Sequence, residues 1–512
     1  MLTKTWSAAI QGIEAYTVEV EVNASGAGND TLVNVVGLPD TAIRESRERV
    51  WSAMVSNGFF PPEGRTTVNL APADVRKEGS AFDLPIALGM IGACNQIDRG
   101  QLQKTMIVGE LALDGTVRPV NGCLPIGLHA ERCGMKDLLV PSPNASEAAV
   151  AQNINVYGVD NLQQAVSLLR GEEQLEPTRI DVNDLYEQAA GADNIDFADV
   201  KGQETAKRAV EIAAAGGHNM LLLGPPGTGK SMLAKRIPSV LPRLTLDEAL
   251  EVTRVHSIGG FLEKNQALIT ERPFRAPHHT VSDAGLLGGQ TIPRPGEISL
   301  AHNGVIFLDE LPEFKRNVLE VLRQPLESGS VTISRAGGSS TFPAAFMLVS
   351  AMNPCPCGHY GSVQRPCRCT QGQIQRYRAR VSGALLDRID IHVEVAPVQD
   401  QELLNRPDGE SSADIRSRVV AARERQNERF DGDGVRTNAQ MTPSQLHSFC
   451  EPDESAKSML KNAIADLNLS ARAYDRILRL ARTIADLENE KDISAQHVIE
   501  AVQYRSLDRQ SW

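Results

Sequence analysis

The sequence predicts an α/β protein in which a parallel sheet with a phosphate-binding loop and a helical lid follows an α+β domain. Three observations lead to this prediction. The apolar run Leu221–Leu223 enters a glycine-rich loop and then a helical pattern. A second apolar run, Val305–Leu308, ends in two carboxylates. Before residue 170, period-two strand patterns alternate with helical stretches.

The loop after Leu223 has the complete GxxxxGKS spacing between a strand and a helix, which predicts that it binds nucleotide phosphates. Its glycines let backbone N–H groups approach the phosphates, and the helix start adds positive charge. Lys230 is expected to reach the terminal phosphates and Ser231 to ligate Mg²⁺, so ATP and Mg²⁺ are the predicted cofactors. The predicted ATP-binding residues are Gly224, Pro225, Pro226, Gly227, Thr228, Gly229, Lys230 and Ser231.

Length and composition are those of an ordinary soluble protein. The 512 residues suffice for roughly three domains, and 41% are hydrophobic and 23% charged. Met1–Trp6 lacks the apolar run of a signal peptide, and no apolar run is long enough to span a bilayer, so we expect a cytoplasmic protein without membrane contact. The net charge of −12 argues against a uniformly basic nucleic-acid binder, although it leaves room for a local basic strip.

Residues 1–170 are expected to form the α+β domain. Tyr16–Val22 alternates with period two, and Leu32–Val36 is interpreted as the neighbouring strand. Asp40 can cap a helix that runs through Met54. The segments 109–122 and 134–141 resemble the Lon-type protease domain, which implies an S5-type fold for this part of the chain.

The protease chemistry of that family is not expected here. Alignment on Ile86 and Ala87 places Asp83 where the family keeps its serine nucleophile, and Leu124 stands where it keeps its lysine base. A Ser–Lys dyad needs a hydroxyl beside an amine of lowered pKa, and a leucine cannot take a proton. Ser80 lies nearby without an evident partner. We therefore predict a catalytically degenerate domain with a structural or binding role.

The rest of the chain divides at two polar stretches. Residues 171–195 form a polar, proline-containing linker about which domains are expected to pivot. The central domain is expected at 196–397, and its first segment, Asp196–Gln203, resembles the box that AAA+ ATPases place against adenine, although alone it is equally a capped helix. Residues 398–512 are expected to form a helical lid that closes over ATP. Its amphipathic stretches are Ala413–Phe430, Ser455–Leu467, Ala471–Leu487 and Ser494–Ser506.

Two further strand ends in the central domain supply catalytic candidates. Val305–Leu308 delivers Asp309 and Glu310 to the edge where parallel sheets bind ligands. Asp309 is expected to hold Mg²⁺, directly or through water, and Glu310 to polarise the attacking water. An Asp that merely caps the next helix is the alternative. Asn353 ends another apolar strand and suits orienting the lytic water, but Asn-Pro is also a common turn opener.

Two arginines resemble functional groups of ring-forming AAA+ proteins. Arg388, in Leu385–Asp390, looks like the arginine finger that reaches the γ-phosphate bound by the neighbouring subunit. A surface ion pair with Asp387 or Asp390 is the alternative. Arg472 resembles the second sensor arginine of the same class. Three more arginines lie close enough to shift that assignment by a turn: Arg476, Arg479 and Arg482.

The segments 272–289, 295–310 and 385–388 are similar to the Mg-chelatase-like AAA+ ATPases, and with the Lon-like first domain the chain resembles the YifB/ComM branch nearly end to end. This resemblance implies a homo-hexameric DNA helicase that drives branch migration when incoming strands are recombined in natural transformation. Two rivals stay open. One is a Mg-chelatase-type motor subunit that remodels a metal-insertion partner, and the other is an ATP-dependent protease, disfavoured by Asp83 and Leu124.

Single-stranded or branched DNA is the expected partner, and two basic segments are candidates for its contacts. Residues 331–342 have two β-prone arms around a Gly-Gly turn, in the position of the family's pore hairpin, where Arg335 would meet phosphates. Arg275 lies in the other inserted loop, together with His278 and His279. An ordinary surface hairpin is the alternative, because one arginine is a thin signal.

Four of the eight cysteines are clustered, in two CxC pairs separated by nine residues. Two short arms can close a tetrahedral zinc site with four thiolates, and disulfides are not expected in a reducing compartment. Free thiols are the alternative, and His359 is a possible substitute ligand. The predicted structural zinc ligands are Cys355, Cys357, Cys367 and Cys369.

Overall fold

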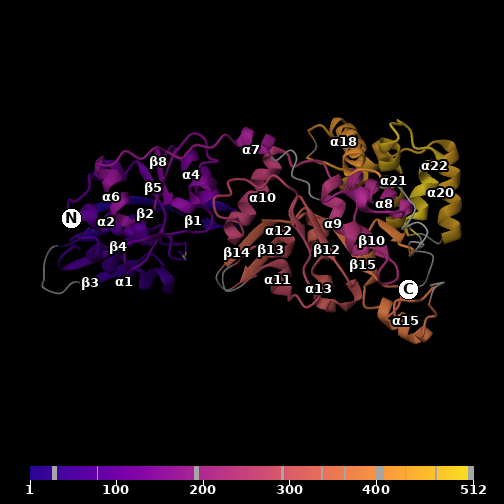
Figure 1. Ribbon diagram of the computed structural model, residues 1–512, viewed down its shortest axis with the longest axis horizontal. Coiled ribbons are helices and arrows are strands. Elements are labelled where there is room, and N and C mark those ends of the chain that lie inside the picture. Colours follow the sequence, from indigo (N-terminus) through magenta and orange to yellow (C-terminus); the bar gives the residue numbers. More distant parts are fainter. Residues whose placement is uncertain are drawn as a thin grey trace.

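The computed structural model describes residues 1–25, 32–75, 77, 79–188, 195–289, 293–335, 338–361, 365–397, 409–432, 434–467 and 470–505. Figure 1 shows an elongated molecule with the first domain at one end, the central sheet in the middle and the C-terminal helices at the other end. The α/β fold class is confirmed, since one parallel and one mixed sheet are each covered by helices.

The first domain is built on a seven-stranded mixed sheet in the order β3-β4-β2-β1-β5-β8-β9. The predicted strand Tyr16–Val22 lies inside β2. The prediction that Leu32–Val36 neighbours it is wrong, because β4 pairs with both and separates them. β3 and β4 are parallel and therefore need a crossover, which α1 provides. The strands are β1 (Leu2–Gln11), β2 (Glu14–Ala24), β3 (Leu32–Val36), β4 (Arg65–Ala71), β5 (Thr105–Ile107), β8 (Asp137–Pro141) and β9 (Asn155–Val159).

The helices of this domain follow local sequence signals. Asp40 caps α1 as predicted, since its Oδ1 accepts the Ile43 N–H at 2.8 Å. The helix α2 is buried along its whole length, as its almost entirely apolar sequence requires. The remaining elements are α1 (Thr41–Ser56), α2 (Asp83–Ala93), α3 (Arg99–Leu102), β6 (Glu110–Leu111), β7 (Val117–Arg118), α4 (Cys123–Arg132), α5 (Ala145–Ala148) and α6 (Leu162–Arg170).

The central domain contains a five-stranded sheet in the order β11-β12-β15-β10-β16, in which every pair is parallel. All the carboxyl ends of its strands therefore meet at one edge. In β10 the side chains alternate between two cores, with Met220 and Leu222 on one face and Leu221 and Leu223 on the other. The strands are β10 (Met220–Leu223), β11 (Phe274–Arg275), β12 (Val305–Leu308), β15 (Met347–Met352) and β16 (Ile391–Glu394).

Helices cover both faces of this sheet, and a separate hairpin projects beside β12. The predicted hairpin is confirmed as β13 (Ser330–Arg335) and β14 (Gly338–Pro343), which pair antiparallel. The helices are α8 (Glu204–Gly216), α9 (Lys230–Val240), α10 (Leu246–Gly259), α11 (Asp283–Leu287), α12 (Glu297–Leu300), α13 (Arg316–Glu320), α14 (Arg323–Ser328), α15 (Gln371–Arg378) and α16 (Gly383–Leu386).

The C-terminal helices share a core with one face of the central sheet. Val419 of α18 and Ile477 of α21 lie in the same buried cluster as Ile212 of α8 and Leu222 of β10. Among the described residues, no helix has both the length and the apolar character needed to cross a membrane. The helices are α18 (Ser412–Arg429), α19 (Pro443–Phe449), α20 (Glu454–Leu467), α21 (Ala471–Leu487) and α22 (Ala495–Gln503).

The first and central domains meet through a buried apolar cluster. Leu124 of α4 is 0% exposed and packs with Ala249 and Val252 of α10. The predicted linker contributes to this contact, because it contains α7 (Val182–Gln188) and buries Val182 in the same cluster. The Tyr186 hydroxyl also donates to the Leu244 carbonyl. The linker is therefore anchored at this interface through Val182 and Tyr186, which argues against the expected pivot.

Polar contacts reinforce the same interface. The Ser257 hydroxyl of α10 donates to Glu147 of α5 at 2.7 Å, and the Gly122 N–H donates to the Ser257 carbonyl at 3.2 Å. Burial raises the pKa of Glu147, and the Ser257 and Asn144 hydrogen bonds counteract part of that shift. Leu124, at the position of the Lon-type lysine base, thus has a packing function.

We predict that Leu124→Ala destabilises the chain by about 2–5 kcal/mol, because the truncation leaves a cavity in a buried cluster. Leu113→Ala, at a leucine of the same domain that is 59% exposed, should change stability by no more than about 0.5 kcal/mol. Calorimetry of the full chain measures both effects. Equal unfolding temperatures for the two variants would contradict the interface.

Candidate functional site

The phosphate loop connects β10 to α9 at the carboxyl edge of the central sheet. Gly227 and Gly229 have positive φ values of 81° and 88°, which a side chain would strain. A Cβ at Gly224 would lie 2.3 Å from the Val395 carbonyl oxygen. These glycines allow the loop to fold back on itself, and Gly229 begins α9 so that the helix start faces the loop.

Lys230 is held inside this loop by acceptors. Its Nζ donates to the Gly224 and Pro225 carbonyls, each at 2.8 Å, and to Asn353 Oδ1 at 3.3 Å. Burial lowers the pKa of Lys230, and the Asp309 carboxylate opposes that shift. The structure therefore brings the predicted Asn353 and Lys230 together at the end of neighbouring strands.

Ser231 and Asp309 form a pair of oxygen ligands beside the lysine. The Ser231 hydroxyl donates to Asp309 Oδ2 at 2.6 Å. Hydroxyl and carboxylate oxygens are ligands that Mg²⁺ accepts, so these two residues can hold the ion. Asp309 Oδ1 accepts the N–H of Glu310, and the side chain makes no helix cap in the structure.

Glu310 projects into solvent at the same edge. Its backbone has φ +52°, a left-handed conformation that is uncommon for a residue with a side chain and that often marks functional sites. The side chain is 55% exposed, and His279 Nδ1 lies 3.7 Å from its Oε2. The sequence did not predict this neighbour, because His279 is joined to Glu310 only through the pairing of β11 with β12.

Gln203 links the predicted adenine box to the phosphate loop. Its side-chain amide donates to the Ala396 carbonyl and, at 3.4 Å, to the Thr228 carbonyl. Asp196 caps the short turn that follows it, and its carboxylate also accepts the N–H of Ser412. The box is therefore a set of capping and loop contacts between the phosphate loop and the C-terminal helices.

Arg388 lies at the opposite edge of the sheet. It precedes β16 by three residues, and its carbonyl accepts from Asn219, which directly precedes β10. The four residues of β10 separate this edge from the phosphate loop by about 13 Å. The guanidinium pairs with Glu327, not with the two aspartates considered from sequence. Its buried Nε has no hydrogen-bond partner among the described residues.

Arg472 lies beside Arg388, in a cavity of about 520 Å³ lined by several arginines. Its Nη1 is 3.9 Å from Asp387 Oδ2, and its side chain is 71% exposed. By contrast Arg476 pairs with Asp390 at 15% exposure, and Arg482 is 4% exposed. Arg472 therefore lies with Arg388 near the amino ends of the strands, and its role as a sensor arginine stays a prediction.

The two arginines considered for DNA differ in their surroundings. Arg335 ends β13 with an exposed side chain. Arg275 lies on β11, where Glu297 accepts two hydrogen bonds from its guanidinium at 2.7 and 2.8 Å, and Phe261 lies below it at 5.9 Å. This arrangement gives Arg275 a structural contact within the chain, and its contact with DNA stays a prediction.

The four clustered cysteines come together after β15. Cys355 Sγ lies 3.4 Å from Cys357 Sγ and 3.7 Å from Cys367 Sγ, and Cys357 and Cys367 are 3.6 Å apart. Within the described chain, the four sulfurs form a group that could hold a metal, to which His359 contributes no ligand atom. The backbone N–H groups of Arg368 and His359 lower the pKa of Cys357 to about 6, which favours its thiolate. All eight cysteines are unbridged.

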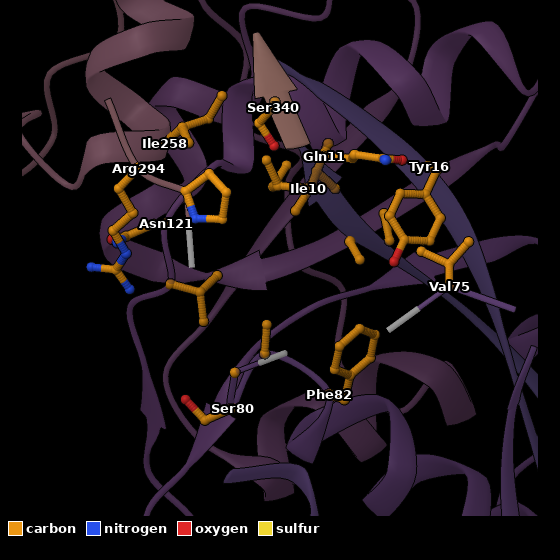
Figure 2. Close-up of a pocket in the computed structure, with 18 of the residues that line it drawn as sticks. Ile10, Gln11, Tyr16, Val75, Ser80, Phe82, Asn121, Ile258, Arg294 and Ser340 are labelled. Carbon is orange, nitrogen blue, oxygen red and sulfur yellow. The ribbon is translucent and has the colours of Figure 1, made fainter. Parts of the chain in front are cut away.

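A cavity of about 400 Å³ lies beside the degenerate protease position (Figure 2). Ser80, Phe82 and Tyr16 line it from the first domain, and Arg294 and Ser340 from the central domain. Ser80 donates its hydroxyl to Glu110, a partner that the sequence did not reveal. The ammonium of the nearby buried Lys77 donates to the Val75 carbonyl at 2.7 Å.

Asp83 is built into the core of the first domain. It is fully buried, and Arg49 donates to its two oxygens at 2.7 and 3.0 Å. Burial raises the pKa of Asp83, while the Arg49 guanidinium offsets part of that shift. Asp83 and Leu124 thus both have packing partners in place of a catalytic arrangement.

Comparison with known proteins identifies the family. Models described as "Magnesium chelatase, subunit ChlI", "Subunit ChlI of Mg-chelatase" and "Magnesium chelatase, subunit ChlI C-terminal" match residues 196–403, 18–144 and 409–505. Competence protein ComM of Haemophilus influenzae is 45% identical over 510 residues, which is 99% of this chain and 98% of ComM. The chain belongs to the Mg-chelatase-like ComM/YifB family.

Other relatives agree with this assignment. The uncharacterized protein YifB of Escherichia coli is 44% identical over 495 residues, 96% of this chain and 94% of YifB. The magnesium-chelatase 67 kDa subunit of Chlorobaculum parvum is 26% identical over 277 residues, only 53% of this chain and 36% of the subunit. ComM/YifB membership identifies the central domain as a Mg-chelatase-like AAA+ module and indicates ATPase activity with ATP and Mg²⁺.

Proposed function

We propose that this protein is an ATP-driven ring motor, a homo-hexamer, that acts on DNA. The observation that carries the proposal is the separation of its charged groups. Lys230, Ser231 and Asp309 gather at the carboxyl edge of the sheet, whereas Arg388 and Arg472 gather at the amino edge. Because the two sets lie at opposite edges of one chain's sheet, this separation supports a neighbouring copy as the source of the arginines.

Within this ring, each group has a distinct chemical role. Lys230 binds the terminal phosphates, and Ser231 and Asp309 would hold Mg²⁺, which would supply positive charge beside the phosphates. Glu310 accepts a proton from the attacking water, which Asn353 orients. Arg388 and Arg472 of the neighbour stabilise the transferring phosphoryl group, so hydrolysis depends on assembly.

DNA is the proposed substrate because the hairpin β13–β14 carries an exposed cation, Arg335, on an otherwise acidic chain. The name of the 45% identical relative, competence protein ComM, supports a role in competence. We propose branch migration as the reaction. A chelatase-type motor is the second candidate, supported by the family models. Stimulation of ATP hydrolysis by DNA favours the first, and its absence favours the second.

Replacing the proposed general base tests the motor most simply. Glu310→Gln should bind ATP and assemble but slow hydrolysis by about 10² to 10⁴-fold, and it should stall strand displacement on a branched DNA. Glu313→Gln is the matched control, because Glu313 lies on the same turn, is exposed and pairs with Arg380. Wild-type turnover in Glu310→Gln would refute the assignment.

The hairpin contact is tested by binding. Arg335→Ala should weaken single-stranded DNA binding and reduce its salt dependence, because a phosphate contact and the counterion it releases are lost. Arg47→Ala, at an exposed arginine of the first domain, serves as the control. Fluorescence anisotropy over a salt series measures both slopes, and identical slopes for the two variants would contradict a role for Arg335.

We also propose that the four clustered cysteines hold a structural zinc ion. Tetrahedral zinc with Zn–S bonds of about 2.3 Å places its sulfurs about 3.8 Å apart, and the observed separations of 3.4 to 3.7 Å are close to this value. Elemental analysis of the purified protein should find about one equivalent of zinc per chain. A content below about a quarter of an equivalent would exclude the site.

A further inference from the structure

We infer that the cysteine site packs against the ATP site and forms one of its walls. Zinc bound to the cysteines holds this wall, and with it the phosphate loop and Asn353, in position. The inference rests on the proposed zinc ion and ATP site, and it gives Pro226 and Gly358 a positioning role. The first arm of the site is 355–361 and the second is 365–369.

The first connection is covalent. β15 ends at Met352, Asn353 follows, and only Pro354 separates Asn353 from the ligand Cys355. Asn353 Oδ1 in turn accepts from Lys230 Nζ at 3.3 Å. Any displacement of the first arm is therefore passed within two residues to the side chain that touches Lys230.

The second connection is a close packing contact with the phosphate loop itself. Gly358 has φ +82°, and a Cβ placed on it would lie 2.6 Å from Pro226 Cδ. The glycine therefore allows the first arm to lie directly against the loop. Pro226 is the residue before Gly227, whose positive φ shapes the phosphate cradle.

The third connection fixes the first arm to α15. Arg378 Nε donates to the Pro354 carbonyl at 3.2 Å, and its guanidinium lies 5.3 Å from the centre of the Tyr360 ring. Tyr360 donates its N–H to Cys355 Sγ at 3.3 Å, and Cys369 donates its N–H to Cys367 Sγ at 3.4 Å. Both sulfurs thus accept a backbone donor, as the thiolates of a metal site do, while the ion joins the two arms.

Zinc supplies what these contacts lack. Without it, the sulfurs of the two arms meet through weak contacts. With it, four metal–sulfur bonds fix Cys355, and hence Asn353 and the wall against Pro226. We therefore expect zinc to raise nucleotide affinity without touching the nucleotide.

The test measures zinc content and nucleotide affinity in parallel. Full-length protein is stripped with a chelator, titrated with a fluorescent ATP analogue, and titrated again after one equivalent of zinc is restored. We expect removal of zinc to weaken binding of the ATP analogue about tenfold or more, a change about as large as the loss of one or two hydrogen bonds. Restoring zinc should restore the affinity for the analogue. Cys369→Ser should behave as the stripped protein, and Cys133→Ser, at an exposed cysteine of the first domain, as wild type.

Gly358→Ala tests the packing contact with Pro226 independently of zinc binding. It also keeps the inference testable if Cys369→Ser fails to fold. It should keep its zinc and still bind the analogue more weakly, because the added methyl displaces Pro226. Unchanged affinity in stripped protein or in zinc-loaded Gly358→Ala overturns the inference. Protein that purifies without zinc also overturns the inference. If that protein binds ATP and displaces strands, the proposed ring motor is still supported. If zinc-loaded wild-type protein neither binds ATP nor displaces strands, the proposed function is refuted instead.

Discussion

The parallel direction of the five central strands is the constraint on which the rest of the structure depends. Because every carboxyl end lies at one edge, Lys230, Asp309 and Asn353 lie close together there, although they are far apart in the chain. Lys230 donates to Asn353, and the adjacent Ser231 donates to Asp309. The same constraint places whatever precedes a strand at the opposite edge. Arg388 precedes β16, so the topology separates it from the phosphate loop of its own chain.

The first domain has structural contacts at the two positions where the Lon-type domain that it resembles keeps its catalytic dyad. A lysine at position 124 would be an unpaired cation in an apolar cluster, which is strongly unfavourable, whereas Leu124 joins α4 to α10 of the central domain. At position 83 a carboxylate pairs with Arg49 in the core. The domain packs against α10 of the central domain, and its β1–β2 turn brings Gly12 close to the hairpin strand β14 at Thr341.

Much of the fold could be predicted because it is encoded locally. The phosphate loop, the carboxylates after β12, the hairpin and the four amphipathic helices of the C-terminal region all lie where their residue patterns indicated. The order of the strands in the sheet was harder to predict, because nothing within Leu32–Val36 indicates that β4 separates it from β2. The packing of the linker was missed for the same reason, because the partners of Val182 lie on α4 and α10.

The site residues that could not be predicted are those joined only by tertiary contact. Glu327 pairs with Arg388 across 61 residues, and no spacing rule connects them. Gly358 follows a CxC pair, but its need to be a glycine arises from Pro226, 132 positions earlier in the chain. The ion pair of Arg275 was also unforeseen, because its partner Glu297 lies on a different element.

The claim that each ATP is completed by two chains can be tested by mixing variants. Lys230→Ala lacks the phosphate lysine, and Arg388→Ala lacks the arginine of the opposite edge, so each alone should hydrolyse ATP at least about 10³-fold more slowly than wild type. In mixed rings an intact Lys230 meets an intact Arg388 at some interfaces, so mixing should restore ATPase activity. Arg388→Ala that is fully active alone, or a mixture of co-assembled variants that stays inactive, would contradict this claim.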